Sequence, residues 1–405
     1  MRRLAVLSLH TSPLAQLGAG DGGGMNVYVR ELSGALARAG VDCDVYTRAS
    51  APGLAPTVDV EPGVRVHHVA AGPLRPVPID ELPALVGGFT AGVLGRMAAD
   101  SPPDLIHANY WLSGLSGHVL KHTLELPLVS TFHTLARVKA EAEADDHGLR
   151  ARAEAEVIGC SDAILANSPD EAMQLERLYA AVPARIEVVA PGVDHRLFFP
   201  GDRAASRAEL GLGTEPVLLF VGRIQRLKGA DVAVRALAAL DRFPTATLVL
   251  VGGPSGPDGD AELARLQDLV VECGVRDRVR FVPAQPHGSL ATYYRAADVC
   301  LVPSRSESFG LVALEAAACG TPVVAAAVGG LRSLVAHEAT GFLVDGREPG
   351  DFAAFTARLL AEPGLAAEMG ARASAAARRY RWSITAARLR RVYADLTVRE
   401  LVECR

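Results

Sequence analysis

The chain has 405 residues, of which 49 % are hydrophobic and 21 % charged, a balance typical of a soluble globular protein with about two to three domains. Its net charge of −5 argues against a general binder of nucleic acid or of anionic membrane surfaces. The six cysteines show no metal-ligand spacing such as C-x-x-C, which disfavours a zinc site or disulfide framework and predicts that most are buried small hydrophobic residues.

Short apolar runs alternate with amphipathic segments along the first half of the chain. Val29, Leu32 and Leu36 recur at spacings of three and four, which predicts a helix over 25–39. The strands predicted in this half are 4–9, 41–47, 104–109, 127–131, 163–168 and 186–190. Strands that alternate with helices predict a parallel sheet covered by helices on both faces.

The same alternation restarts after residues 191–202, which are rich in Pro and Gly, lack a helical period and are interpreted as a linker. The elements predicted beyond it are strands at 217–223, 246–253, 279–282, 299–303 and 322–327, a helix at 231–240 and a long amphipathic helix within 381–405.

Two doubly wound domains follow from this pattern. We expect an N-terminal domain over 1–190, a C-terminal domain over 203–380, and a final helix over 381–405 that packs back on the N-terminal domain. Such a pair binds its ligand in the cleft between the domains, at the carboxyl ends of the strands. The run LAVLSL is too short for a signal peptide, and no stretch approaches the ~20 apolar residues of a membrane span, so we expect a cytoplasmic protein.

Residues 18–32 read GAGDGGGMNVYVREL, a glycine cluster that runs from the first strand into a helix. Glycine lets backbone N–H groups approach a phosphate, and the helix N-terminus adds partial positive charge. The spacing matches neither G-x-G-x-x-G nor G-x-x-x-x-G-K-[ST]. A flexible glycine loop explains the segment equally well.

Two cations lie at the carboxyl end of the strand predicted at 217–223: Arg223 is its last residue and Lys228 follows it. At the carboxyl end of a strand they can clamp a diphosphate, arginine through two parallel hydrogen bonds and lysine as a point charge. A solvated pair of loop charges is the alternative.

Residues 304–315 read SRSESFGLVALE and place Glu307 in a predicted loop and Glu315 inside a helix that starts near Gly310. A carboxylate can accept two hydrogen bonds from a vicinal diol, and the first N–H groups of a helix attract phosphate. This single segment can therefore grip both ends of a sugar nucleotide; otherwise the two glutamates are a capping residue and a surface residue.

Two further segments lie at the carboxyl ends of predicted strands, where they could contact a ligand. Gly329 and Gly330 follow the strand at 322–327 and open a helix, which permits close approach. His133 follows the strand at 127–131 in the first domain. A single histidine can be structural, but the end of a parallel strand is also where ligands bind.

Together these motifs resemble the retaining glycosyltransferases of family 4, over nearly the whole chain. The resemblance implies the GT-B fold, two Rossmann-like doubly wound α/β domains facing a central cleft. The N-terminal segments SLHTSPLAQLGAGDGGGMNVYVREL, HANYWLSG and FHTLARVK are similar to the mycothiol-pathway inositol-phosphate N-acetylglucosaminyltransferases, and more loosely to sucrose-phosphate synthases.

The resemblance also implies a role for each residue. Catalysis would rest on Arg223, Lys228, Glu307 and His133, with His133 beside the 6-position of the transferred sugar. The donor would be held by Gly23, Gly24, Arg223, Lys228, Glu307, Ser308, Phe309, Gly310 and Leu311, with Glu315 on the ribose and the base near Phe281–Pro283. The acceptor would be held by Asn26, Tyr110, Thr134, Lys139 and Arg150.

The implied reaction transfers a hexose or N-acetylhexosamine, with retention, from a nucleotide sugar to a small hydroxylated acceptor. The two cations make a metal unnecessary; Asp258 and Asp260 have metal-ligand spacing but sit in an apparent solvated turn. We expect no cofactor, no nucleic-acid partner and no membrane span. Among donors, a UDP-sugar is favoured over GDP- and ADP-sugars. The sequence leaves open whether the protein forms a homodimer.

One departure puts the acceptor in doubt. The mycothiol enzymes carry a phosphate-binding lysine where Ile79 stands here, leaving Arg75 as the only cation in 72–83, and their H-x-H-Y reads His107-Ala108-Asn109-Tyr110. A lost charge favours a changed acceptor, such as a neutral or amino-bearing cyclitol or another polyol, although inositol phosphate stays the leading single candidate.

Other classes fit the sequence less well. A sugar-nucleotide 2-epimerase has the same fold but needs general acid and base groups around the sugar. A non-catalytic binder would have lost Arg223, Lys228 or Glu307, and all three are present. A nicotinamide dehydrogenase is disfavoured because the glycine fingerprint is absent after the first strand.

Overall fold

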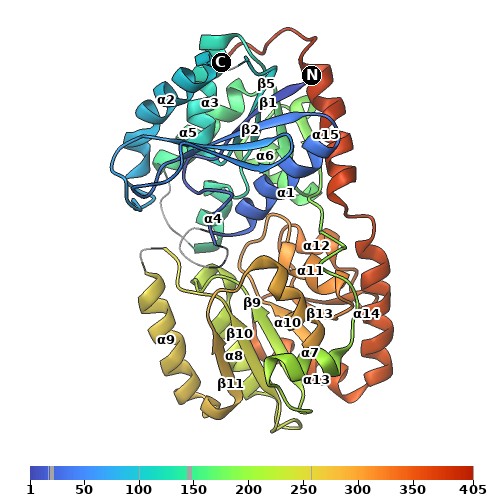
Figure 1. Ribbon diagram of the computed structural model, residues 1–405. Coiled ribbons are helices and arrows are strands. Elements are labelled where there is room, and N and C mark those ends of the chain that lie inside the picture. The colour runs from blue at the N-terminus through green and yellow to red at the C-terminus, as the bar shows by residue number, and fades with distance from the viewer. Residues whose placement is uncertain (17, 19–21, 100, 144–147, 257, 405) are drawn as a thin grey trace. The chain divides into compact units, whose positions relative to one another are not determined.

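The computed structural model describes residues 1–405 apart from 17, 19–21, 100, 144–147, 257 and 405, and describes no side chain at 142 or 143. By its internal contacts the chain divides into two compact units (Figure 1). Unit 1 comprises Met1–Ala15, Gly24–Gly192 and Trp382–Arg405, and unit 2 comprises Gln16–Gly23 and Val193–Arg381. The C-terminal helix is thus part of unit 1, and a short segment from the N-terminal region is part of unit 2.

Unit 1 is built on an eight-stranded sheet with the order β3-β4-β2-β1-β5-β6-β7-β8. Every neighbouring pair is parallel except β3 and β4, which the sequence analysis did not predict and which pair antiparallel at one edge. The strands are β1 (Arg3–Leu7), β2 (Asp42–Arg48), β3 (Thr57–Glu61), β4 (Val64–Val69), β5 (Leu105–Asn109), β6 (Leu128–Thr131), β7 (Ala163–Ala166) and β8 (Ile186–Val188).

Helices supply the apolar faces that close the core of unit 1. Val29, Leu32 and Leu36 of α1 are buried, as their spacing predicted. The helices are α1 (Gly24–Arg38), η1 (Leu82–Leu85), α2 (Val86–Ala99), α3 (Trp111–Leu124), α4 (Ala136–Glu143), α5 (Gly148–Cys160), α6 (Pro169–Tyr179), η2 (Pro183–Arg185) and α15 (Trp382–Leu396). The last of these packs on α1, where the rings of Trp382 and Tyr28 meet edge to face.

One segment of unit 1 passes a length-and-composition test for a membrane span, contrary to the expectation that no stretch comes near that length. It is Leu82–Ala99, 18 residues formed by η1 and α2, and it is the one such segment in the part of the chain that the structure describes. Phe89, Val93 and Met97 lie in the core of unit 1. Because a core helix passes the same test, the segment is weak evidence for a membrane span.

Unit 2 is built on a six-stranded, fully parallel sheet with the order β11-β10-β9-β12-β13-β14. Its strands are β9 (Val217–Val221), β10 (Thr247–Val251), β11 (Val279–Val282), β12 (Val299–Val302), β13 (Val323–Ala326) and β14 (Gly341–Val344), the last unpredicted. Its helices are α7 (Arg203–Leu210), η3 (Arg226–Lys228), α8 (Ala230–Ala238), α9 (Gly259–Glu272), η4 (Arg276–Arg278), η5 (His287–Ser289), α10 (Leu290–Ala296), α11 (Leu311–Ala318), α12 (Leu331–Leu334), α13 (Pro349–Ala361) and α14 (Pro363–Ala377).

The cysteines correct one prediction. Cys43, Cys300 and Cys319 are buried as expected, but Cys160 forms a disulfide with Cys404. The two residues are 244 positions apart, so no spacing pattern in the sequence could reveal their pairing.

Candidate functional site

The strand order of unit 2 reverses between β9 and β12. Strands β10 and β11 lie on one side of β9, whereas β12, β13 and β14 lie on the other. In open α/β sheets the carboxyl ends of strands at such a switch point form the ligand crevice. The chain leaves β9 toward η3, which ends at Lys228, and leaves β12 toward the loop that contains Glu307.

Lys228 and Glu307, both predicted as donor-site residues, pair with each other at this switch point. Lys228 Nζ lies 2.7 Å from Glu307 Oε2, and the two side chains are 26 % and 16 % exposed. Because both charged groups remain partly open to solvent, an anion or a hydroxyl group can approach them without displacing a buried network.

Glycines let the Glu307 loop pack tightly against the turn after β13. A Cβ on Gly329 would stand 2.0 Å from the Glu307 carbonyl oxygen, which forbids any other residue there, and the Gly330 N–H donates to the same oxygen over 2.9 Å. Gly310 has a φ of +104° and caps α11, so Ser308, Phe309 and Leu311 flank a helix start. The first N–H groups of that helix have no acceptor within the helix and present positive potential beside Glu307.

Glu315 sits deeper in α11 and is only 4 % exposed. Its Oε1 accepts from His287 Nε2 over 2.7 Å and its Oε2 accepts from Tyr294 Oη over 2.8 Å. Burial, and then the neighbouring carboxylate, raise the pKa of Tyr294 well above its usual value. Each carboxylate oxygen can still accept one more hydrogen bond, so the predicted ribose contact stays a prediction. His287 escaped the sequence analysis because it is 28 residues from its partner.

Arg223 lies against the short N-terminal segment that belongs to unit 2. Its Nη1 donates to Ser255 Oγ over 3.4 Å, and a Cβ on Gly23 would stand 3.3 Å from its Nε. Residues 19–21 of the glycine cluster lie outside the described residues, and Gly24 begins α1 in unit 1. Asp258, one of the two aspartates with metal-ligand spacing, immediately precedes α9. Its carbonyl oxygen accepts a hydrogen bond from the Glu262 N–H.

The sheet of unit 1 has its own switch point, between β1 and β5. Tyr110 follows β5 with a φ of 75°, and His133 follows β6 with a φ of 61°. Residues other than glycine seldom occupy this region, and those that do cluster at functional sites. His133 Nε2 donates to Asn109 Oδ1 over 2.9 Å. Asn109 Nδ2 is buried and has no hydrogen-bond partner among the described residues. Asn109 was not among the predicted site residues, although its position at the carboxyl end of β5 could have identified it as one.

Burial lowers the pKa of His133 to about 3, with nearby His107 and His10 as lesser causes. The ring is therefore neutral near pH 7 and can exchange hydrogen bonds but not supply charge.

Three of the five predicted acceptor residues share one network of contacts. Arg150 donates to Glu154 over 2.7 Å and to the Thr134 carbonyl and hydroxyl oxygens over 2.6 Å and 2.9 Å. Its guanidinium carbon lies 4.8 Å from the centre of the Tyr110 ring. Arg150, Thr134 and Tyr110 thus come together, but the arginine also neutralises a fully buried carboxylate.

Two other acceptor candidates lie outside this network. Asn26 is buried and its Nδ2 donates to Thr11 Oγ1 over 2.7 Å and to the Ser12 carbonyl oxygen over 2.6 Å. Lys139 is half-buried on α4. Ile79 packs partly against the core of unit 1.

Two family models match the chain and together span most of it. The model described as Glycosyltransferase Family 4 matches residues 22–197, and that described as Glycosyl transferases group 1 matches residues 202–377.

Relatives and solved structures agree with these models. The D-inositol 3-phosphate glycosyltransferase of Acidothermus cellulolyticus is 49 % identical over 97 % of this chain and 90 % of its own length, and that of Mycobacteroides abscessus is 49 % identical over 95 % and 87 %. The structure of sucrose-phosphate synthase from Thermosynechococcus elongatus superimposes with a TM-score of 0.92 and 36 % identity, over 98 % of this chain and 99 % of that one.

A more distant likeness concerns the fold alone. The Anabaena protein HepE, solved in complex with UDP and glucose, has a TM-score of 0.79 and 21 % identity, over 98 % of this chain and all of that one. The family is shown by the relatives whose sequences are more than 30 % identical to this chain over almost its full length. The chain is a glycosyltransferase of the GT-B fold and belongs to the family-4 glycosyltransferases.

Proposed function

We propose that this protein is a retaining hexosyltransferase. It moves a hexose or N-acetylglucosamine from a nucleotide sugar, a UDP-sugar foremost, to a hydroxyl of a small cyclitol or polyol, with inositol phosphate as the leading acceptor. The observation that carries the proposal is the part-exposed pair of Lys228 and Glu307 beside the start of α11. The names of the relatives support the acceptor, and the UDP in the HepE complex supports a UDP-sugar.

In this proposal unit 2 binds the donor. Arg223 and Lys228 neutralise the diphosphate, with the main chain at Gly23 close to Arg223. The N–H groups at the start of α11 and the Glu307 carboxylate hold the hydroxyls of the transferred sugar, and Glu315 holds the ribose. On donor binding, the Lys228 ammonium exchanges part of its contact with Glu307 for a phosphate oxygen, which frees carboxylate lone pairs for sugar hydroxyls.

The reaction then needs no side-chain nucleophile. The bond from the anomeric carbon to the diphosphate oxygen breaks, and the electron pair leaves on the diphosphate. An acceptor hydroxyl attacks from the face of departure and gives its proton to a diphosphate oxygen, which retains the anomeric configuration. The fixed charges of Arg223 and Lys228 stabilise the anion that develops, so turnover proceeds without added divalent cation.

Unit 1 binds the acceptor in this proposal. Asn26, Tyr110, Thr134, Lys139 and Arg150 line its site, and neutral His133 contacts the 6-hydroxyl of the transferred sugar. The unsatisfied Asn109 Nδ2 supports a ligand here, because a buried donor without a partner costs about 1–3 kcal/mol that a hydroxyl oxygen would recover.

A second acceptor class is favoured by Ile79. An apolar, half-buried side chain stands where the resemblance implies a phosphate-binding lysine, and Arg75, the one cation within residues 72–83 of the sequence, donates to the Pro76 carbonyl oxygen. A non-phosphorylated aminocyclitol, sugar or other polyol would not need the missing charge.

The deciding experiment is a donor-by-acceptor panel that follows nucleotide release. UDP-, GDP- and ADP-sugars are each combined with inositol phosphate, free inositol, aminocyclitols and sugar phosphates, and NMR reads the anomeric configuration of each product. We expect rapid UDP release only with a cyclitol or polyol present. Turnover of donor alone into a 2-epimer would refute transfer, and an inverted product would refute the mechanism. A cytoplasmic location and a homodimer stay predictions.

A further inference from the structure

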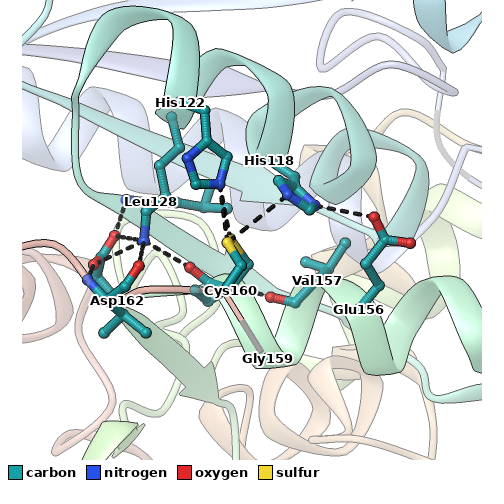
Figure 2. Close-up of a disulfide and its surroundings, with 12 residues drawn as sticks. His118, His122, Leu128, Glu156, Val157, Gly159, Cys160 and Asp162 are labelled. Carbon is teal, nitrogen blue, oxygen red and sulfur yellow. Dashed lines mark hydrogen bonds and ion pairs between the residues drawn. A yellow bond between two sulfur atoms is a disulfide. The ribbon is translucent and has the colours of Figure 1, made fainter.

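Two histidines and two cysteines of unit 1 form a cluster that the proposed reaction does not use. His118 and His122 lie on α3, Cys160 is the last residue of α5, and Cys404 lies in the C-terminal tail. One nitrogen or sulfur atom from each lies within 4.8 Å of the corresponding atoms of the other three. Figure 2 shows both imidazole rings directed toward the disulfide sulfurs, His122 toward both and His118 toward that of Cys404.

Apart from the two bonded sulfurs, the ligand atoms are spaced close to the distances of a tetrahedral metal site. Zn–S bonds of about 2.3 Å and Zn–N bonds of about 2.0–2.1 Å place ligand atoms roughly 3.3–3.8 Å apart. His122 Nε2 lies 2.9 Å from Cys404 Sγ and 3.3 Å from Cys160 Sγ, and His118 Nε2 lies 3.8 Å from Cys404 Sγ. The two histidines reach the cluster together because residues four apart share one face of a helix.

A carboxylate orients one of the rings from behind. His118 Nδ1 lies 3.2 Å from Glu156 Oε1, which leaves Nε2 directed toward the sulfurs (Figure 2). Metal-binding histidines commonly donate their second ring N–H to a carboxylate, since this fixes the ring and strengthens the ligand nitrogen. A disulfide alone would have no use for this arrangement.

A separate buried network holds the tail in place. Lys121 Nζ, 1 % exposed, lies 2.8 Å from the Cys160 carbonyl oxygen, 3.0 Å from Asp162 Oδ1 and 2.9 Å from the Val402 carbonyl oxygen. The Val402 N–H donates to Asp162 Oδ1 over 2.7 Å. Cys404 is therefore brought to the cluster by contacts that do not depend on a bond between the sulfurs.

We propose that His118, His122, Cys160 and Cys404 bind one Zn²⁺ in the reduced protein. Two equivalents of a low-molecular-weight thiol reduce the Cys160–Cys404 disulfide and become one disulfide themselves, and Zn²⁺ then displaces the two cysteine protons. Two thiolates and two imidazoles in a tetrahedral set suit zinc better than harder cations. All four positions are filled by protein, so the site is structural and ties the C-terminal tail to α3 and α5.

The first test measures metal binding directly. The full chain without an affinity tag is reduced with excess thiol, freed of it anaerobically and titrated with Zn²⁺ against a chromophoric chelator. We expect one tightly bound zinc per chain by elemental analysis. With Co²⁺ in its place we expect thiolate charge-transfer bands and the strong visible bands of a tetrahedral ion. A reduced protein that binds neither ion, or one whose two thiols are oxidised to the disulfide by air as fast with zinc as without it, would overturn the proposal.

Variants then assign the ligands. Cys404→Ser and His122→Asn should abolish stoichiometric binding, and Glu156→Gln should weaken it roughly tenfold. Cys273→Ser is the matched control, because Cys273 is a free, half-buried cysteine of unit 2 and should retain full binding. Equal losses in Cys273→Ser and Cys404→Ser would contradict the assignment. Because the readout is metal bound per chain, it is independent of the outcome of the donor and acceptor panel.

Discussion

The switch points of the two sheets present polar groups in different states. At the β9/β12 point of unit 2, Lys228 and Glu307 pair with each other and are partly exposed. In unit 1, beside the β1/β5 point, Arg150 pairs with a fully buried Glu154 and His133 is held neutral by burial. Charges in unit 2 are therefore available to exchange with an ionic ligand, whereas those in unit 1 are already committed to the fold. The comparison predicts that substitutions in unit 2 mainly affect activity and that several in unit 1 also affect stability.

The largest effect is expected from Lys228→Ala. Removing a fixed cation from the departing diphosphate should lower kcat/KM about a hundredfold, or about 3 kcal/mol, in a nucleotide-release assay. Arg226→Ala is the control, since this cation of the same turn is 73 % exposed and pairs with Glu262 at 3.5 Å. Similar rates for the two variants would remove the basis for the donor site.

Arg150→Met should have its main effect on stability. It leaves the carboxylate of Glu154 with the Ala136 N–H and the Tyr179 hydroxyl but without its cation, and should lower the stability of unit 1 by about 2 kcal/mol. Urea unfolding followed by tryptophan fluorescence reports on this unit alone, because both tryptophans, Trp111 and Trp382, belong to it. Arg152→Met, an exposed cation on the same helix, should stay within about 0.5 kcal/mol of the native protein. An unchanged midpoint for Arg150→Met would show that the network does not support the fold.

Ile79→Lys sharpens the comparison on the acceptor side. The lysine stem can cover the apolar surface that Ile79 covers while its ammonium reaches solvent, so the fold should tolerate it. If the acceptor is a phosphate, kcat/KM for inositol phosphate should rise about tenfold while that for free inositol stays unchanged. Ile79→Leu is the control for shape. A gain for both acceptors, or for neither, would place the acceptor phosphate elsewhere.

The smallest effect concerns pH. Burial lowers the pKa of His107 to about 3, while its nitrogens contact Thr131 and Tyr393 at 2.8 Å and 2.9 Å. The unfolded state, with a pKa near 6.5, binds a proton that the folded state does not, so stability is fully present above about pH 6.5 and falls as pH drops toward 3. One such group costs roughly 0.7 kcal/mol between pH 7 and pH 6. In urea unfolding, the stability of His107→Asn should fall less than that of the native protein between pH 7 and pH 6, by that amount. An identical pH dependence of stability in the variant and the native protein would contradict a buried, neutral His107.

Several features of fold and donor site were open to prediction from local patterns. The helix over 25–39 follows from the spacing of Val29, Leu32 and Leu36, and the helix start at Gly310 from glycine after a buried strand. Strands β3, β4 and β14 were missed: β3 and β4 carry charged residues among their apolar ones, and β14 begins at a glycine, a residue that is rare in strands. The membrane-length apolar helix at Leu82–Ala99 was missed because glycines and a proline interrupt it.

The sequence by itself determined the alternation of strands and helices in two series, and the glycines, cations and carboxylates that follow particular strands. These are local properties, because periodicity and turn chemistry act over a few residues. Only the tertiary structure decided which distant groups meet: His287 with Glu315, Arg150 with Thr134 and Tyr110, and Cys404 with Cys160 and two histidines of α3. Those pairings depend on strand order and on where the C-terminal tail packs, and such long-range contacts are set by burial of the whole core rather than by any local run of residues.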